Sequence, residues 1–141
     1  MSDDLYPKPV LRLAASAAGA GRLAPHDREG MAHNPVCGDR VSVTLRLDAD
    51  GRIAELAHET RACVLAQASA AILGARLKGA TESDIAELRA AIEAMLAGGV
   101  APAAPFADYE ALKGVAAYRG RHACVLLPVR AIENALKSSY D

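Results

Sequence analysis

Residues 40–47 alternate strictly between polar and apolar side chains, and this pattern constrains the fold more than any other stretch. A period of two residues is typical of a β-strand with one buried face. The sequence D-A-D-G at residues 48–51 is a turn signal, and residues 52–60 form a plausible returning strand. We therefore predict an antiparallel hairpin, whose two outer ends bring residues 37–39 close to residue 63. The apolar members of the first strand are Val41, Val43, Leu45 and Leu47.

Cysteines stand at both ends of this hairpin. Cys37 and Asp39 precede it with Gly38 between them, and Cys63 follows it. The third cysteine, Cys124, stands like Cys63 directly before an apolar run of helical period. A thiol at a helix N-terminus faces unpaired N–H groups and the positive end of the dipole, which favours the thiolate that binds metals. Three such thiolates and one carboxylate make a candidate set of four metal ligands.

Each of these residue types also has a plain structural interpretation. A single cysteine is more often a small buried hydrophobic residue than a ligand, and Asp39 taken alone is most often a turn residue. Ser69 has no recognisable base, so a serine hydrolase is rejected. His58 lies on a half-buried strand face and is expected in the core. We expect His26 and His33 in a solvated loop, where His33 is close enough to the first cysteine to be a minor ligand candidate.

Composition limits the class of protein. The 141 residues suit a single domain, 1–141, with 52% hydrophobic residues, 4% aromatic residues and a net charge of −1. This balance offers no nucleic-acid footprint. No apolar run has membrane-spanning length and the acidic N-terminus lacks signal-peptide features, so we expect a cytoplasmic protein without a membrane partner. Thiols stay reduced in that compartment, and an odd number of them argues against a disulfide framework.

Helices account for most of the remaining chain. The sequence T-E-S-D at residues 81–84 is similar to a capping box, and Pro128 is expected in the first turn of the last helix. Residues 22–33 are expected to form a loop or an irregular edge strand, and residues 101–106 a mobile connector. The predicted helices cover residues 8–15, 64–78, 81–96 and 125–138, with one further turn at residues 109–113. The predicted fold class is α+β, a small antiparallel sheet packed against several helices.

Three motifs combine these cysteines with their surroundings. They are N-P-V-C-G-D-R-V at residues 34–41, A-C-V-L-A-Q-A-S-A-A-I-L at residues 62–73 and G-R-H-A-C-V-L-L-P-V-R-A-I-E-N-A-L at residues 120–136. In this order and spacing they resemble the IscU/SufU/NifU N-terminal family of iron–sulfur cluster assembly proteins. The resemblance extends from about Leu5 to Leu136, and it implies an α+β domain of the SufE/NifU-like kind.

The resemblance also implies a chemistry for the site. Such proteins receive sulfur from a cysteine desulfurase, hold a transient iron–sulfur cluster and serve apo iron–sulfur acceptor proteins. By this resemblance, Cys37, Asp39, Cys63 and Cys124 are the expected ligands of a [2Fe–2S] cluster. In the SufU branch the protein uses a bound Zn²⁺ while it accepts persulfide, for which Cys37 and Cys124 are the candidate acceptors.

Two features bring the chain nearer to the SufU branch. Residues 80–115 form a segment of some length between the helices, and Arg121 stands three positions before the last cysteine. The IscU branch has a histidine immediately before that cysteine, where this chain has Ala123. His122 is displaced by one position, so its ring is expected to point elsewhere. Arg121 and Arg119 are expected to be surface charges that can lower the pKa of a nearby thiol or meet an acidic partner.

Three functions remain open at this point. The leading one is a scaffold without enzymatic activity that holds a labile cluster; the oxygen ligand Asp39 favours it, because clusters prefer four thiolates and an oxygen holds them less firmly. The second is a zinc-dependent sulfurtransferase that activates a cysteine desulfurase. The third is a structural zinc domain with a binding role.

Overall fold

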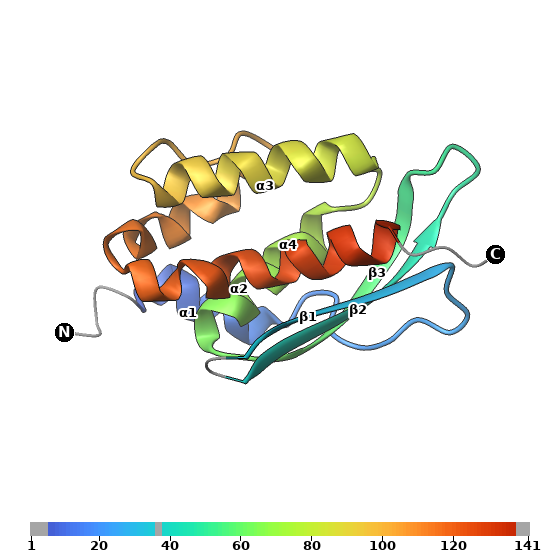
Figure 1. Ribbon diagram of the computed structural model, residues 1–141, viewed down its shortest axis with the longest axis horizontal. Coiled ribbons are helices and arrows are strands. Elements are labelled where there is room, and N and C mark those ends of the chain that lie inside the picture. The colour runs from blue at the N-terminus through green and yellow to red at the C-terminus, as the bar shows by residue number, and fades with distance from the viewer. Residues whose placement is uncertain (1–5, 36–37, 138–141) are drawn as a thin grey trace.

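A three-stranded antiparallel sheet lies against a layer of helices (Figure 1). The strands β1 (Arg28–Asn34), β2 (Asp39–Leu47) and β3 (Ile53–Arg61) are neighbours in chain order. The computed structural model describes residues 6–35 and 38–137. The predicted α+β class is confirmed.

The predicted hairpin is formed by β2 and β3. Their register pairs Val43 with His58 and Leu45 with Leu56, and it shifts only after Arg46 near the turn. The predicted apolar face is the one that the helices cover, with Val43 2% and Leu45 0% exposed. Because alternation places successive side chains on opposite faces, the even-numbered residues of β2 lie on what we call the outer face.

β1 is more regular than the sequence predicts. Residues 28–34 pair with β2 over their whole length, although only Ala32 of this strand is buried. The inward-facing positions of this strand lack bulky apolar residues because α4 approaches them closely: a Cβ at Gly30 would overlap the backbone of Ala131 and Ala135. The need for a small residue therefore hides the usual strand pattern.

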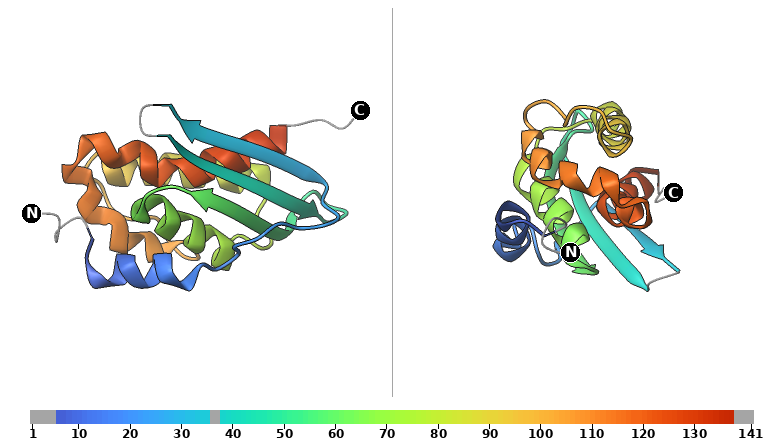
Figure 2. Two further views of the ribbon diagram at one scale, coloured as in Figure 1. Left: turned by 90° about the horizontal axis from the view of Figure 1, so that it is seen from below. Right: turned by 90° about the vertical axis from the view of Figure 1, so that its left-hand side faces the viewer.

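Helices cover the inner face of the sheet in two layers (Figures 1 and 2). The helices are α1 (Lys8–Ser16), α2 (Val64–Arg76), α3 (Glu82–Leu96) and α4 (His122–Lys137), with the 3₁₀ helices η2 (Ala107–Ala117) and η3 (Arg119–Arg121). α4 lies along β1 and β2, and α2 packs against β3 and α4. α1 and α3 pack outside them, against α2 and α4 respectively.

The start of α3 follows the predicted capping box. The Thr81 hydroxyl accepts a hydrogen bond from the Asp84 N–H at 3.1 Å, and the Asp84 carboxylate accepts one from the Thr81 N–H at 2.9 Å. These two bonds satisfy donors that a helix N-terminus would otherwise leave unpaired, and they hold the pKa of Asp84 below its ordinary value.

The last third of the chain differs from the prediction in three ways. η2 is a 3₁₀ helix of 11 residues instead of a single turn. It continues through η3 into α4, which begins at His122, so Cys124 lies in the first turn and Pro128 in the helix interior. Since proline has no N–H, Pro128 cannot donate the hydrogen bond that a helix residue usually gives to the carbonyl four positions earlier. The connector at residues 101–106 is anchored by the buried residues Pro102 and Phe106.

An arm at residues 17–27 crosses the far part of the outer face. It pairs with β3 where Gly21 N–H donates to the His58 carbonyl at 2.8 Å. Further along, Leu23 N–H donates to the Thr44 hydroxyl at 3.0 Å, which explains why this outer-face threonine is buried. Within the described ranges, no helix has the length and apolar character that crossing a membrane requires.

Candidate metal centre

Three predicted ligands meet at one end of the sheet. The ligand atoms of Asp39, Cys63 and Cys124 all lie within 4.8 Å of one another. Asp39 is the first residue of β2, Cys63 caps the start of α2 and Cys124 lies in the first turn of α4. The hairpin therefore brings Asp39 to Cys63 as predicted, and the packing of α4 adds Cys124. Cys37 lies outside the described residues, so its part in the site stays a prediction.

The carboxylate of Asp39 lies at the centre of this group. Its Oδ2 is 3.8 Å from the Cys124 Sγ, which donates a weak hydrogen bond to it, and 3.5 Å from the backbone nitrogen of Cys63. Cys124 is only 4% exposed, whereas Asp39 and Cys63 are half-buried. A carboxylate and two thiolates this close repel one another when all are ionised, and a bound cation removes that penalty.

Arg121 supplies positive charge beside the thiols. The neighbouring Tyr6 raises the pKa of Arg121 above its ordinary value, partial burial opposes this, and Cys63 and Cys124 raise it further. Arg121 is half-buried in η3, whereas Arg119 of the same short helix is exposed. The predicted contact of an arginine with the thiols is therefore made by Arg121, which places a positive charge beside both cysteines.

The donor set suits two kinds of guest. Thiolate sulfur and carboxylate oxygen are ordinary ligands of tetrahedral Zn²⁺, and thiolates bind iron–sulfur clusters. In the part of the chain that the structure describes, no fourth His, Cys, Asp or Glu joins the group of three. Cys37 is two residues before Asp39 in the chain and is the predicted fourth ligand.

Sequence comparison identifies the family. A family model described as the NifU-like N terminal domain matches residues 5–125. This chain belongs to the NifU-like N-terminal domain family. A crystal structure of a nitrogen-fixing NifU-like protein (N-terminal) from Brucella abortus has a TM-score of 0.90 and 35% sequence identity, covering 96% of this chain and 94% of that one.

Two curated relatives carry functional names. The NifU-like domain is 29% identical over 105 residues to the zinc-dependent sulfurtransferase SufU of Bacillus subtilis. The aligned residues cover 74% of this chain and 71% of the relative. It is 30% identical over 108 residues to the iron–sulfur cluster assembly scaffold protein IscU of Streptococcus pyogenes. This alignment covers 76% of this chain and 67% of the relative.

The histidines of this NifU-like domain point away from the three ligands. His122 Nε2 donates to the carbonyl oxygens of Val115 and Ala116, both at 3.1 Å, so its ring points into η2 as the sequence predicts. His33 lies on β1 rather than in a loop, with its side chain exposed. His58 is 6% exposed and is a core residue, as predicted. His26 is half-buried instead of solvated, and its Nε2 is 3.4 Å from a carboxylate oxygen of Glu29.

A buried hydroxyl pair supports the helix that carries Cys124. Ser69 Oγ donates to the Val125 carbonyl at 2.8 Å and accepts from the Tyr109 hydroxyl at 2.7 Å. Burial raises the pKa of Tyr109, so its hydroxyl stays protonated and can donate. Ser69 is therefore a structural link between α2, η2 and α4, in agreement with the rejection of a serine hydrolase. Sequence reasoning missed Tyr109, which gave no motif signal.

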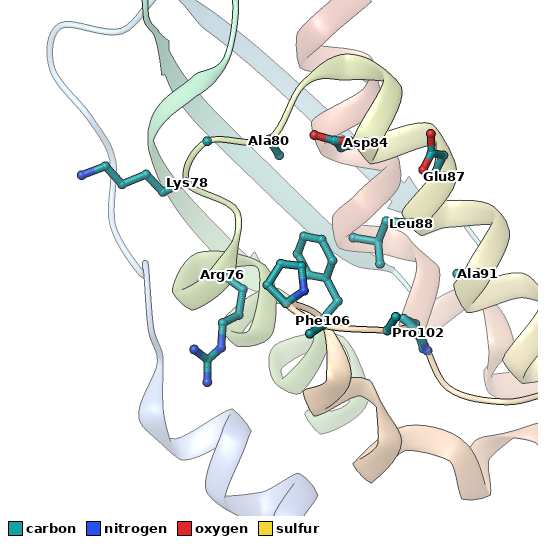
Figure 3. A pocket seen from close by; sticks show the side chains of 13 residues that line it. Arg76, Lys78, Ala80, Asp84, Glu87, Leu88, Ala91, Pro102 and Phe106 are labelled. Atoms are coloured by element: carbon teal, nitrogen blue, oxygen red, sulfur yellow. The ribbon is translucent and has the colours of Figure 1, made fainter.

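A separate cavity of about 410 Å³ opens between α3 and the connector (Figure 3). Leu88 and Phe106 form its apolar floor, and it contains none of the three ligands. Some of its charged groups already have partners: Arg76 binds Asp108 at 3.2 Å, and Asp84 belongs to the capping box of α3. The candidate metal centre is thus a surface site at the end of the sheet, remote from this cavity.

Proposed function

We propose that this protein is an iron–sulfur cluster assembly scaffold. The cargo is a transient [2Fe–2S] cluster held by Cys37, Asp39, Cys63 and Cys124 and handed to apo acceptor proteins. The observation that carries the proposal is the meeting of Asp39, Cys63 and Cys124 within 4.8 Å in a NifU-like domain. The name of the Streptococcus pyogenes relative, an assembly scaffold, supports it.

The described ligands favour loading. Cys63 stands at the N-terminus of α2, where unpaired N–H groups and the helix dipole stabilise a thiolate. Asp39 accepts a weak hydrogen bond from the Cys124 thiol at 3.8 Å, so the two groups already face each other in the site. Arg121 adds positive charge beside both thiols and limits the repulsion among the anionic ligands.

The same ligands favour release. An oxygen ligand binds a cluster less firmly than a fourth thiolate, so Asp39 gives the cluster one weak attachment. Asp39 and Cys63 are half-buried, which leaves the site accessible from the end of the sheet. The proposed partners are a cysteine desulfurase, which supplies the sulfur, and the apo proteins that accept the cluster.

Anaerobic reconstitution tests this proposal. The protein is incubated with ferrous iron, cysteine and a cysteine desulfurase, and the visible absorption and zinc content of the same sample are measured. We expect thiolate-to-iron charge-transfer bands that are lost in Cys37→Ser, Cys63→Ser and Cys124→Ser. Ser83→Ala is the control, because this serine is exposed on α3 away from the site. A wild-type protein that stays colourless under these conditions contradicts the scaffold.

A zinc-dependent sulfurtransferase is the second candidate function. It is favoured by the 29% sequence identity to SufU of Bacillus subtilis and by Arg121, which lies beside the thiols. In this function Zn²⁺ occupies the same ligands, and Cys37 or Cys124 accepts sulfur as a persulfide. The experiment above separates the two, since a colourless protein that retains zinc and speeds desulfurase turnover supports the transferase.

A further inference from the structure

One row of the sheet carries a cationic type of side chain on every strand. His33 of β1 pairs with Arg40 of β2, and Arg40 pairs with Arg61 of β3. Directly opposed residues of an antiparallel pair point to the same face, with their Cβ atoms about 5 Å apart. All three side chains are exposed. We call these three residues the cationic row.

The cationic row is not explained by the stability of the fold. Like charges placed directly opposite each other on neighbouring strands destabilise a sheet. Among the described residues, neither Arg40 nor Arg61 has a hydrogen bond or ion pair that would offset this repulsion. Two guanidinium groups therefore face each other in solvent, with an imidazole beside them.

The rest of the outer face is arranged differently. Arg46 pairs with Glu55 at 2.7 Å, and Arg22 of the arm pairs with Glu29 at 2.8 Å. Glu59, which lies between these pairs and the cationic row, is 4.0 Å from Arg22. Among the described residues of the outer face, the arginines without an acidic partner thus lie at one end of the sheet, in a chain whose net charge is −1.

That end of the sheet is the end that carries the candidate metal centre. Asp39 immediately precedes Arg40, and Cys63 follows Arg61 by two positions. Because successive strand residues point to opposite faces, Asp39 faces the helices while Arg40 faces outward. The outer face is seen in the left view of Figure 2, with the start of α4 behind the same end. A protein that reaches around this edge to the ligands also covers the cationic row.

We propose that the cationic row is a docking surface for an acidic patch on the cysteine desulfurase that serves this site. The inference rests on the proposed function, which requires a sulfur donor to reach Asp39 and the cysteines. A donor that returns in every cycle has to associate quickly, and unpaired charges at an interface rim act mainly on the association rate. A protein partner fits better than nucleic acid, because two arginines and a histidine without neighbouring aromatic residues are too few for a phosphate track.

Charge reversal at the two arginines tests this surface. The variant Arg40→Glu with Arg61→Glu is compared with Arg12→Glu with Arg130→Glu, which changes the net charge equally at exposed positions on α1 and α4. Association and dissociation rate constants with the cysteine desulfurase are measured by stopped flow over a range of salt concentrations. At low salt we expect association of the row variant to be at least about tenfold slower, and association of the control to stay within about twofold of wild type.

The salt dependence and the metal content complete the test. We expect the difference from wild type to shrink as salt rises, with zinc content and thermal unfolding unchanged. The milder pair Arg40→Gln with Arg61→Gln removes the charges without reversing them. It should also slow association, and it replaces the Glu variant if that variant is poorly folded. Equal association rates for the row variant and the control overturn the proposal. The proposal is also overturned if the substitutions leave desulfurase binding unchanged but abolish a salt-sensitive binding of the wild-type protein to an oligonucleotide probe.

Failure of the proposed function gives a different result. If the wild-type protein neither binds the desulfurase nor acquires a cluster or zinc, the function and the docking surface are both overturned. If it binds and is loaded normally while the row variant behaves like the control, only the docking surface is overturned.

Discussion

Asp39 is the residue at which the candidate metal centre departs from an all-thiolate set. It accepts a hydrogen bond from the Cys124 thiol and lies next to the Cys63 nitrogen, so its carboxylate is already directed at the site. A hard oxygen among soft sulfur ligands is the natural first point of exchange, because iron–sulfur clusters prefer thiolates. The residue thus links the geometry of the site to the lability that a scaffold needs.

The variant Asp39→Ala therefore separates assembly from transfer. We expect a cluster still to form on the cysteines, and its transfer to an apo-ferredoxin to slow by roughly tenfold, because the labile ligand is gone. The measurement is the half-time of transfer followed by visible absorption, with Asp50→Ala in the exposed hairpin turn as control. Transfer at the wild-type rate would show that release does not start at the carboxylate.

His58 makes the stability of the fold depend on pH. Burial lowers the pKa of His58 below its ordinary 6.5, and the Ala18 carbonyl, which accepts a hydrogen bond from Nε2 at 2.9 Å, opposes this only in part. The neutral ring is therefore favoured in the folded state, while the unfolded chain takes up a proton near pH 6.5. Its contribution to stability is present above pH 6.5 and is lost as the pH falls toward the lower folded pKa.

Urea denaturation at several pH values from neutral to mildly acidic tests this sign. As the pH is lowered, we expect the free energy of unfolding of the wild type to decrease more steeply than that of His58→Gln. Glutamine does not titrate, so the difference between the two proteins isolates His58 from His26 and the carboxylates. Parallel pH profiles would mean that His58 binds its proton equally well in the folded and unfolded states, so that any loss of stability comes from other groups.

At the scale of elements, close backbone contact explains how small strands and helices build a dense core. α4 lies so near to β1 that a Cβ at Gly30 would overlap the backbone of Ala135. In the same way, a Cβ at Gly74 of α2 would overlap the Ala18 carbonyl just after α1. Both contacts join backbone to backbone, so neither neighbour can yield by rotating a side chain.

Gly30→Ala should therefore disturb the packing of α4 on the sheet. We expect a loss of about 1–3 kcal/mol in the free energy of unfolding, the usual cost of overpacking a dense core. Gly120→Ala is the matched control, since nothing lies within 4 Å of its added Cβ, and it should change stability by less than about 0.5 kcal/mol. Equal effects in urea denaturation would argue against a close contact between β1 and α4.

At the scale of the whole molecule, local patterns predict local structure and miss what distant packing imposes. The hairpin, the capping box and the meeting of Asp39 with Cys63 are encoded by residues near each other in the chain. The regular pairing of β1 is not encoded locally, because its small residues are required by the close approach of α4, which lies about 100 residues later in the chain. The sequence also fails to predict the early start of α4 at His122. The residues just before it are polar and belong to the 3₁₀ helix η3, so they show no apolar helical pattern.

The metal centre itself is a contact of this long-range kind. It joins the start of β2, the start of α2 and the first turn of α4, so a bound ion would cross-link the two ends of the hairpin to α4. An ion that binds only the folded state stabilises it by about 2.7 kcal/mol at a concentration of 100 times its dissociation constant. Zinc should therefore raise the stability of the whole fold and protect the first turn of α4 in particular.

Thermal unfolding of the chelator-treated protein with and without Zn²⁺ measures this linkage. For a chain of this size we expect the midpoint to rise by about 5–10 °C at saturating zinc, and EDTA to reverse the rise. Cys63→Ser and Cys124→Ser should abolish most of it, because each removes one of the three convergent ligands. Ser83→Ala, remote on α3, should keep it. A rise that survives both cysteine variants would place the stabilising ion elsewhere, whereas hydrogen exchange slowed at residues 122–125 only in the zinc-bound wild type would locate it at this centre.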